Sequence, residues 1–129
     1  MGRIVIVDDE KIFADILAWI LRKAGHEVFT ATTPMEGIEQ GILHQPDIII
    51  ADWILKNHIH GGEVARHIHA AWPHARTIII TGHIEMVSQA RSWCDCIDEV
   101  IEKPFHRERI LAAVNQLLSE RELVPADAC

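Results

Sequence analysis

The chain has 129 residues, of which 49% are hydrophobic and 24% are charged, and its formal net charge is −7. This length predicts one domain, and the composition excludes a disordered or fibrous protein. No apolar run reaches the roughly 18 residues of a transmembrane helix, and the N-terminus lacks the features of a secretory signal peptide. We therefore expect a cytoplasmic protein without membrane contact. Because no basic patch is present, we also expect no direct binding of nucleic acid.

Short β-branched runs alternate along the chain with stretches of helical periodicity. The predicted strands are residues 3–7, 27–30, 47–51, 76–80 and 98–101. Three of these runs are continuously apolar, which is typical of strands that are covered on both faces of a parallel sheet. The strand pattern therefore predicts a buried parallel sheet.

The helical stretches lie between the predicted strands. An apolar stripe runs from Ile12 to Leu21, and Gly25 follows it as a C-terminal cap. Thr33 and Pro34 have the N-cap and first-turn positions of a second helix. Further helices are predicted at 61–71 and 85–92, and a last one has its apolar face at 110–118. We expect a domain spanning 1–121 and a flexible C-terminal tail at 122–129.

Strict alternation of five strands with five helices predicts a doubly wound α/β fold with a central parallel sheet. Ligands of such folds bind beyond the carboxyl ends of the strands. The residues at these ends are Asp8-Asp9-Glu10 after the first strand, Asp52 after the third, Thr81 after the fourth and Lys103-Pro104 after the fifth. Carboxylates, a hydroxyl and an ammonium group should therefore converge at one edge of the sheet.

This convergence is typical of phosphoryl transfer. Neighbouring carboxylates repel one another, and a hard cation such as Mg²⁺ removes the repulsion. An aspartate carboxylate is a competent nucleophile, and a lysine supplies a point charge for phosphoryl oxygens. A single aspartate after a strand is more often only a turn or cap residue, so the prediction depends on the joint placement of these groups.

The sequence resembles the receiver domain of two-component response regulators over residues 3–120. The matching segments are IVIVDDE (4–10), DIIIADWIL (47–55), GGEVA (61–65), IIITG (78–82) and EKPF (102–105). The resemblance implies a flavodoxin-like sheet with the strand order 2-1-3-4-5. It also implies that Asp52 is the phosphoacceptor.

The same resemblance implies roles for other residues of the pocket. Asp8 and Asp9, together with Asp52 and the backbone carbonyl of Ile54, would hold Mg²⁺. Thr81 would be the switch hydroxyl, and Lys103 the invariant lysine of the family. A cis peptide bond is expected before Pro104, and X–Pro bonds are the ones that tolerate it.

One position departs from the family pattern. Receiver domains usually carry an aromatic residue three positions before the lysine, and this chain has Val100 there. Valine has no ring that can swing between exposed and buried positions. We therefore expect that the usual coupling between Thr81 and an aromatic side chain is altered.

The resemblance implies a signalling switch rather than an enzyme. The domain would accept a phosphoryl group from a histidine kinase or a histidine phosphotransfer protein, and would alter a surface that binds a downstream protein or an output domain. The chain would be a stand-alone regulator or the receiver part of a longer protein. The alternative is a degenerate receiver that binds proteins without phosphorylation. A metal-dependent phosphatase is disfavoured, because the adjacent Asp8 and Asp9 point in different directions.

Histidines and cysteines are further candidate metal ligands in this sequence. His58-x-His60 could bind a transition metal, although a solvated loop is the simpler interpretation. His67 and His69 are a poor pair because i and i+2 side chains of a helix do not face each other. Cys94-x-Cys96 lacks the second pair of a structural zinc site. With Cys129 the cysteines number three, which favours a reducing compartment over a disulfide framework.

Overall fold

The structure is a computed structural model that describes residues 1–55 and 59–123. Five parallel strands form one sheet in the order β2-β1-β3-β4-β5. The strands are β1 (Arg3–Val7), β2 (Glu27–Ala31), β3 (Ile48–Asp52), β4 (Arg76–Thr81) and β5 (Glu99–Glu102). The helices are α1 (Lys11–Lys23), α2 (Pro34–His44), α3 (Gly61–Ala71), the 3₁₀ turn η1 (Ile84–Met86), α4 (Val87–Ser92) and α5 (Arg107–Leu123). The predicted fold class and strand order are confirmed.

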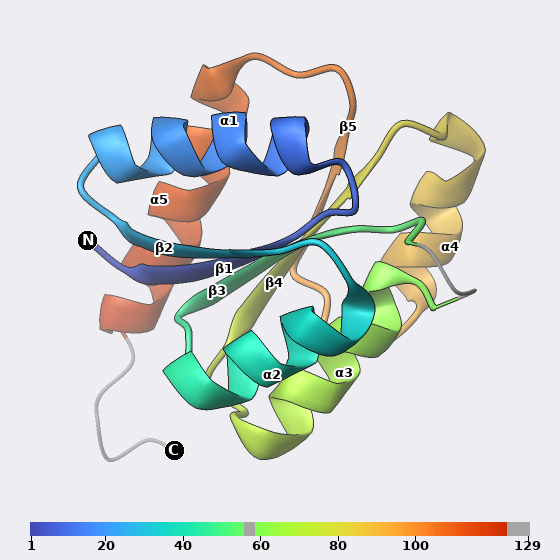
Figure 1. Ribbon diagram of the computed structural model, residues 1–129, viewed down its shortest axis with the longest axis horizontal. Helices are drawn as coiled ribbons and strands as arrows, with labels where there is room; N and C mark the ends of the chain where they lie inside the picture. The colour runs from blue at the N-terminus through green and yellow to red at the C-terminus, as the bar shows by residue number, and fades with distance from the viewer. Residues whose placement is uncertain (56–58, 124–129) are drawn as a thin grey trace.

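The helices cover both faces of the sheet. α1 and α5 lie on one face, and α2, α3 and α4 lie on the other (Figure 1). Alternate residues of the central strands enter the two cores: in β1, Ile4 and Ile6 pack toward α1 and α5, while Val5 and Val7 pack on the opposite side. This two-sided burial explains why the strands are continuously apolar.

The predicted helix boundaries have a local cause. Thr33 Oγ1 accepts a hydrogen bond from the Glu36 N–H at 3.1 Å, which begins α2 at Pro34. Gly25, with φ at 98°, follows the end of α1 in the left-handed conformation that glycine favours. Both predictions are confirmed.

The region between β4 and β5 departs most from the predicted elements. The single helix predicted at 85–92 is a 3₁₀ turn followed by a short α4. β5 begins one residue later than predicted, because Asp98 precedes the strand and binds Thr77 of β4. The Asp98 N–H donates to the Thr77 carbonyl at 2.9 Å, and the Asp98 carboxylate accepts from the Thr77 N–H at 2.8 Å.

One pair of cysteines is bonded, although the cysteine count favours a reducing compartment over a disulfide framework. Cys94 and Cys96 form a disulfide in the loop between α4 and β5, with their Cα atoms 5.2 Å apart. The loop turns back here, since the Ile97 N–H donates to the Cys94 carbonyl at 3.3 Å. This turn brings the two Cα atoms into the range that a disulfide spans.

The C-terminal boundary is described only in part. α5 continues to Leu123, two residues past the predicted end of the domain. Residues 124–129, which make up most of the predicted tail and include Cys129, lie outside the described residues, as does His58. Within the part that the structure describes, none of the helices has the length and apolar character needed to cross a membrane.

Candidate phosphoacceptor site

The carboxyl ends of the central strands bring an ammonium group between two carboxylates. Lys103 Nζ lies 3.0 Å from Asp52 Oδ2 and 3.3 Å from Asp8 Oδ2. Asp8 follows β1, Asp52 ends β3, and β1 and β3 are neighbours in the sheet. Residues 95 and 51 positions apart in the sequence therefore meet at one edge of the sheet.

The backbone fixes both carboxylates. The Asp8 N–H donates to the Ala31 carbonyl at 3.0 Å, and Asp8 Oδ1 accepts from the Glu10 N–H at 2.9 Å. Asp52 Oδ1 accepts from the Ile54 N–H at 3.2 Å. Only 2% of Asp8 and 9% of Asp52 is exposed, so the carboxylates are held in place at the bottom of the pocket.

Lys103 is held by its backbone and by an aromatic ring. Its N–H donates to the Thr81 carbonyl at 2.7 Å, and its Nζ lies 4.1 Å from the centre of the Phe13 ring. The peptide bond between Lys103 and Pro104 is cis, as predicted. The ammonium group is thus directed back into the pocket from the loop that follows β5.

Burial dominates the electrostatics of the pocket. It raises the pKa of Asp8 and of Asp52 above the ordinary value for aspartate, against the opposing effect of Lys103. Burial alone would lower the pKa of Lys103, but the Asp52 and Asp8 carboxylates outweigh it and raise that pKa. The two carboxylates therefore keep Lys103 in its charged form. Burial makes the anionic form of each carboxylate less favourable than it would be in water.

The donor set suits a hard divalent cation. Carboxylate oxygens of Asp8, Glu10 and Asp52 all lie within 4.8 Å of one another. Carboxylate oxygens are ligands that Mg²⁺ prefers. Asp9 is not in this close set, although its charge contributes to the raised pKa of Asp52. Glu10 was not among the predicted ligands; its position directly after two aspartates at a strand end was the available signal.

The predicted switch residues lie in or beside the neighbouring strands. Thr81 is fully buried at the end of β4, and its Oγ1 accepts from the His83 N–H at 3.1 Å. Val100 in β5 is 3% exposed and packs in the core on the α3 side of the sheet. The aliphatic residue at this position is therefore part of the core.

An aromatic cluster adjoins the phosphoacceptor position, and the sequence patterns did not predict it. The Trp53 and His60 rings stack with their centres 4.1 Å apart. The Trp93 and His60 rings are perpendicular, with their centres 4.3 Å apart, and the Arg66 guanidinium lies over the Trp93 ring, 4.4 Å from its centre. His60 is thus packed between two indoles, and among the described residues its buried Nδ1 has no hydrogen-bond partner.

The remaining histidine predictions are only partly described. His67 Nδ1 lies 2.8 Å from the Glu63 carbonyl of the same helix, and no metal-ligand group containing His67 or His69 occurs among the residues that the structure describes. The proposed pair of His58 with His60 is left open, because His58 lies outside these residues.

Comparison with known families agrees with this geometry. The family model described as the response regulator receiver domain matches residues 4–115. The chain belongs to this family. Receiver domains are signalling domains of two-component systems rather than catalytic enzymes, and they interact with histidine kinases and output domains. The predicted family resemblance is confirmed.

Three relatives illustrate the breadth of the match. A receiver domain protein from Methanospirillum hungatei is 28% identical, with a TM-score of 0.86, over 95% of this chain and 97% of that chain. The response regulator TrrA from Thermotoga maritima, in complex with Mg²⁺ and BeF, is 30% identical, with a TM-score of 0.80, over 91% of this chain and 99% of the TrrA chain. The cell cycle transcriptional regulator CtrA of Caulobacter vibrioides is 23% identical over 116 residues, which are 90% of this chain and 50% of CtrA. The chain thus spans about half the length of the curated relatives it matches.

Proposed function

We propose that this receiver domain accepts a phosphoryl group on Asp52 from a phosphohistidine of a histidine kinase or a histidine phosphotransfer protein. The observation that carries the proposal is the position of Asp52, whose carboxylate lies 3.0 Å from Lys103 Nζ in a pocket of converging carboxylates. This contact supports a role for Asp52 as the nucleophile and for Lys103 as the cation that binds a phosphoryl oxygen. This intact arrangement disfavours a degenerate receiver that works without phosphorylation.

The residues of the pocket divide the work of the transfer. An Asp52 oxygen attacks phosphorus, a bond from phosphorus to that oxygen forms, and the bond from phosphorus to the donor imidazole nitrogen breaks. The freed imidazole retains the electron pair of the broken bond. Lys103 balances charge on a phosphoryl oxygen, and the Thr81 hydroxyl binds another after the transfer. The same pocket would assist the later hydrolysis of the acyl phosphate by water.

The carboxylates also fit a bound Mg²⁺. Asp8, Asp9, Asp52 and the backbone carbonyl of Ile54 would hold the ion, and Glu10 is a further candidate because its carboxylate lies within the close set. Oxygen ligands with a few carboxylates suit the preferences of this ion. When bound, Mg²⁺ would supply charge neutralisation for the phosphoryl oxygens.

The output would be a change in a protein-binding surface. In this proposal, phosphorylation at Asp52 shifts the population between two conformations of the domain. A downstream protein, or an output domain of a longer protein, would bind one conformation better than the other. Location in the cytoplasm and the absence of nucleic-acid binding by this domain remain predictions.

Labelling with a small phosphoryl donor tests the proposal. The protein is incubated with acetyl phosphate and Mg²⁺, and its intact mass is measured. We expect the mass of one phosphoryl group to be added, and Asp52→Asn to abolish the addition. Asp15→Asn is the matched control, because Asp15 lies on the exposed side of α1, where it pairs with Lys11. This variant should be labelled like the unchanged protein.

Two results would contradict the proposal. Labelling that persists in the Asp52→Asn variant would place the phosphoryl group elsewhere. An absence of labelling in the unchanged protein, with both acetyl phosphate and a phosphorylated histidine phosphotransfer protein as donors, would favour the degenerate receiver.

A further inference from the structure

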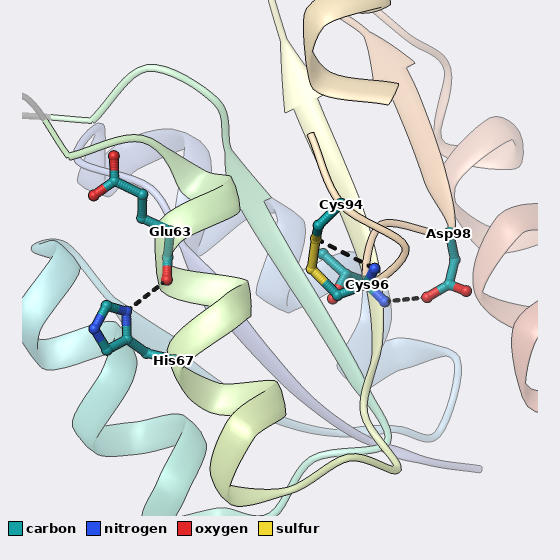
Figure 2. Close-up of a disulfide and its surroundings, with 6 residues drawn as sticks. Glu63, His67, Cys94, Cys96 and Asp98 are labelled. Atoms are coloured by element: carbon teal, nitrogen blue, oxygen red, sulfur yellow. Dashed lines mark hydrogen bonds between the residues drawn. A yellow bond between two sulfur atoms is a disulfide. The ribbon is translucent and has the colours of Figure 1, made fainter. Parts of the chain in front are cut away.

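The loop between α4 and β5 carries a disulfide that the phosphoacceptor pocket does not use. Figure 2 shows Cys94 and Cys96 joined through their sulfur atoms, with Asp98 beside them. Both cysteines are partly exposed, so small thiols can approach the bond. Asp95, between them, is exposed to solvent.

This disulfide is poorly suited to be a structural staple. A disulfide stabilises a fold mainly by restricting the unfolded chain, and the restriction grows with the number of residues in the closed loop. Here the bond joins residues only two positions apart. A domain of this size with two cores needs no staple. The bond therefore contributes little to stability, and a structural role does not account for it.

The surrounding loop keeps the two cysteines near each other whether or not they are bonded. On one side, the Ile97 N–H donates to the Cys94 carbonyl at 3.3 Å. On the other, Asp98 is tied to Thr77 of β4 through its own N–H and through its carboxylate. These hydrogen bonds do not involve the sulfur atoms, so the reduced pair would remain positioned to form the disulfide again.

One hydrogen bond makes the two sulfur atoms unequal. The Cys96 N–H donates to Cys94 Sγ at 3.2 Å (Figure 2). A donor directed at a sulfur stabilises its thiolate. In thiol–disulfide exchange, the sulfur whose thiolate is more stable leaves faster. Cys94 Sγ is therefore the preferred leaving group, and attack is expected at Cys96 Sγ.

We propose that Cys94 and Cys96 form a reversible redox site that exchanges with low-molecular-weight thiols such as glutathione. A glutathione thiolate attacks Cys96 Sγ, the bond between the two protein sulfurs breaks, and Cys94 leaves as a thiolate. A second glutathione thiolate attacks the glutathione sulfur of the mixed disulfide, which releases the Cys96 thiolate and glutathione disulfide. Two electrons pass to the protein, and the protons of the two glutathione thiols end on the cysteines.

The redox site is connected to the loop that follows Asp52. Trp93 directly precedes Cys94, and its ring lies 6.2 Å from the Trp53 ring and 4.3 Å from His60. Trp53 in turn follows Asp52 and is 3% exposed. Opening the disulfide removes a covalent restraint on the residue that follows Trp93. The change should therefore reach the Trp53 and His60 stack, and not only the exposed loop.

The exchange is tested by trapping thiols over a range of redox conditions. The protein carries Cys129→Ser, so that only the loop pair reacts. It is equilibrated with mixtures of glutathione and glutathione disulfide, alkylated, and measured by intact mass. We expect two alkyl groups under reducing conditions and none under oxidising conditions. The change between the two states should occur at the same glutathione ratio whether the protein starts oxidised or reduced. Cys94→Ser should remove the unalkylated oxidised form and give a glutathione adduct at Cys96 instead.

Tryptophan emission tests the connection to the pocket. Oxidised and reduced protein should differ in emission, Trp93→Phe should remove most of the difference, and Trp19→Phe should preserve it, because Trp19 is 57% exposed on α1. This readout needs no phosphorylation, so it can succeed or fail independently of the labelling of Asp52. A pair that stays disulfide-bonded, or stays reduced, at every glutathione ratio would overturn the proposal. Emission that is identical in the two redox states would overturn the connection to the Trp53 and His60 stack.

Discussion

Lys103 Nζ lies 3.0 Å from Asp52 Oδ2, so the cation of the pocket directly contacts the carboxylate that would accept the phosphoryl group. The same ammonium group lies 3.3 Å from Asp8. Lys103 contacts both buried carboxylates, and a metal ion in the pocket would bind the same two carboxylates. Replacing Lys103 should therefore change the affinity for the ion. The first prediction uses this relationship.

Lys103→Met should strengthen the binding of Mg²⁺. The substitution keeps an unbranched side chain of nearly the same length but removes a positive charge that competes with the ion for the carboxylates of Asp8 and Asp52. We expect the dissociation constant for Mg²⁺ to fall by about tenfold, which corresponds to roughly 1.4 kcal/mol, as measured by calorimetric titration. Lys11→Met is the control, because Lys11 pairs with Asp15 on the exposed side of α1. Unchanged or weaker binding in Lys103→Met would show that the ion does not share these carboxylates.

Trp53 should report the binding of Mg²⁺ by its emission. Trp53 follows Asp52 in sequence, is 3% exposed and stacks on His60 at 4.1 Å, so a change of charge at Asp52 alters its surroundings. We expect Trp53→Phe to abolish most of the emission change during a Mg²⁺ titration. The exposed Trp19 provides the comparison: Trp19→Phe should leave the change intact. A metal-dependent change that survives Trp53→Phe unaltered would mean that another tryptophan is the reporter.

Gly61→Ala should damage the pocket more than Gly82→Ala. A Cβ at Gly61 would overlap the backbone carbonyl of Asp52, whereas a Cβ at Gly82 would meet only Lys103 Cβ, at 3.9 Å. We expect Gly61→Ala to lower the free energy of unfolding by about 1–3 kcal/mol and to slow labelling by acetyl phosphate. Urea unfolding and intact mass measure the two effects. If the two alanine variants were equally stable, the close approach at Gly61 would be without consequence.

His26 should make the stability of the domain depend on pH. Its side chain is 7% exposed, and its Nδ1 accepts a hydrogen bond from the Gly2 N–H at 3.0 Å. Burial, with a smaller effect of the N-terminal charge, lowers the pKa of His26 below its ordinary value of 6.5. The unfolded chain therefore binds the proton first as the pH falls. The free energy of unfolding should decrease below pH about 6.5 until the pH is below the folded pKa.

The comparison of two variants isolates this contribution. His26→Gln keeps a side-chain oxygen as an acceptor but does not titrate, so its stability should fall less than that of the unchanged protein between pH about 7.5 and about 5. His74→Gln, at an exposed position, should behave like the unchanged protein. Equal pH dependence in all three proteins, measured by urea unfolding, would exclude His26 as the source.

The response to phosphorylation should be concentrated near Thr81. Val100 is buried in the core and has no ring that can move between two positions. On binding beryllofluoride, amide hydrogen exchange should change most at residues 56–60 and 81–85, and less at 97–101 and 106–118. Of the first loop, residues 56–58 lie outside the described residues. A large change across β5 and α5 with little change at 81–85 would show that Val100 does not limit the switch.

Much of the fold followed from local patterns. The β-branched runs and the caps at Thr33 and Gly25 predicted the strands, the alternation and the parallel sheet, and these are confirmed. Since all strands of a parallel sheet end at one edge, the sequence also predicted that Asp52 and Lys103 lie close together, and the structure has them in contact. The roles of these residues in phosphoryl transfer stay predictions.

Other features depended on tertiary contacts that no local pattern encodes. The turn after β1 decides that Glu10, and not Asp9, lies in the close carboxylate set with Asp8 and Asp52. The short α4 and its following loop bring Trp93 to Trp53 and pair Cys94 with Cys96. The direction of a side chain in an irregular loop is set by what packs against it from distant parts of the chain. Hydrophobic periodicity determines elements and their faces, but only the assembled sheet and helices determine these neighbours.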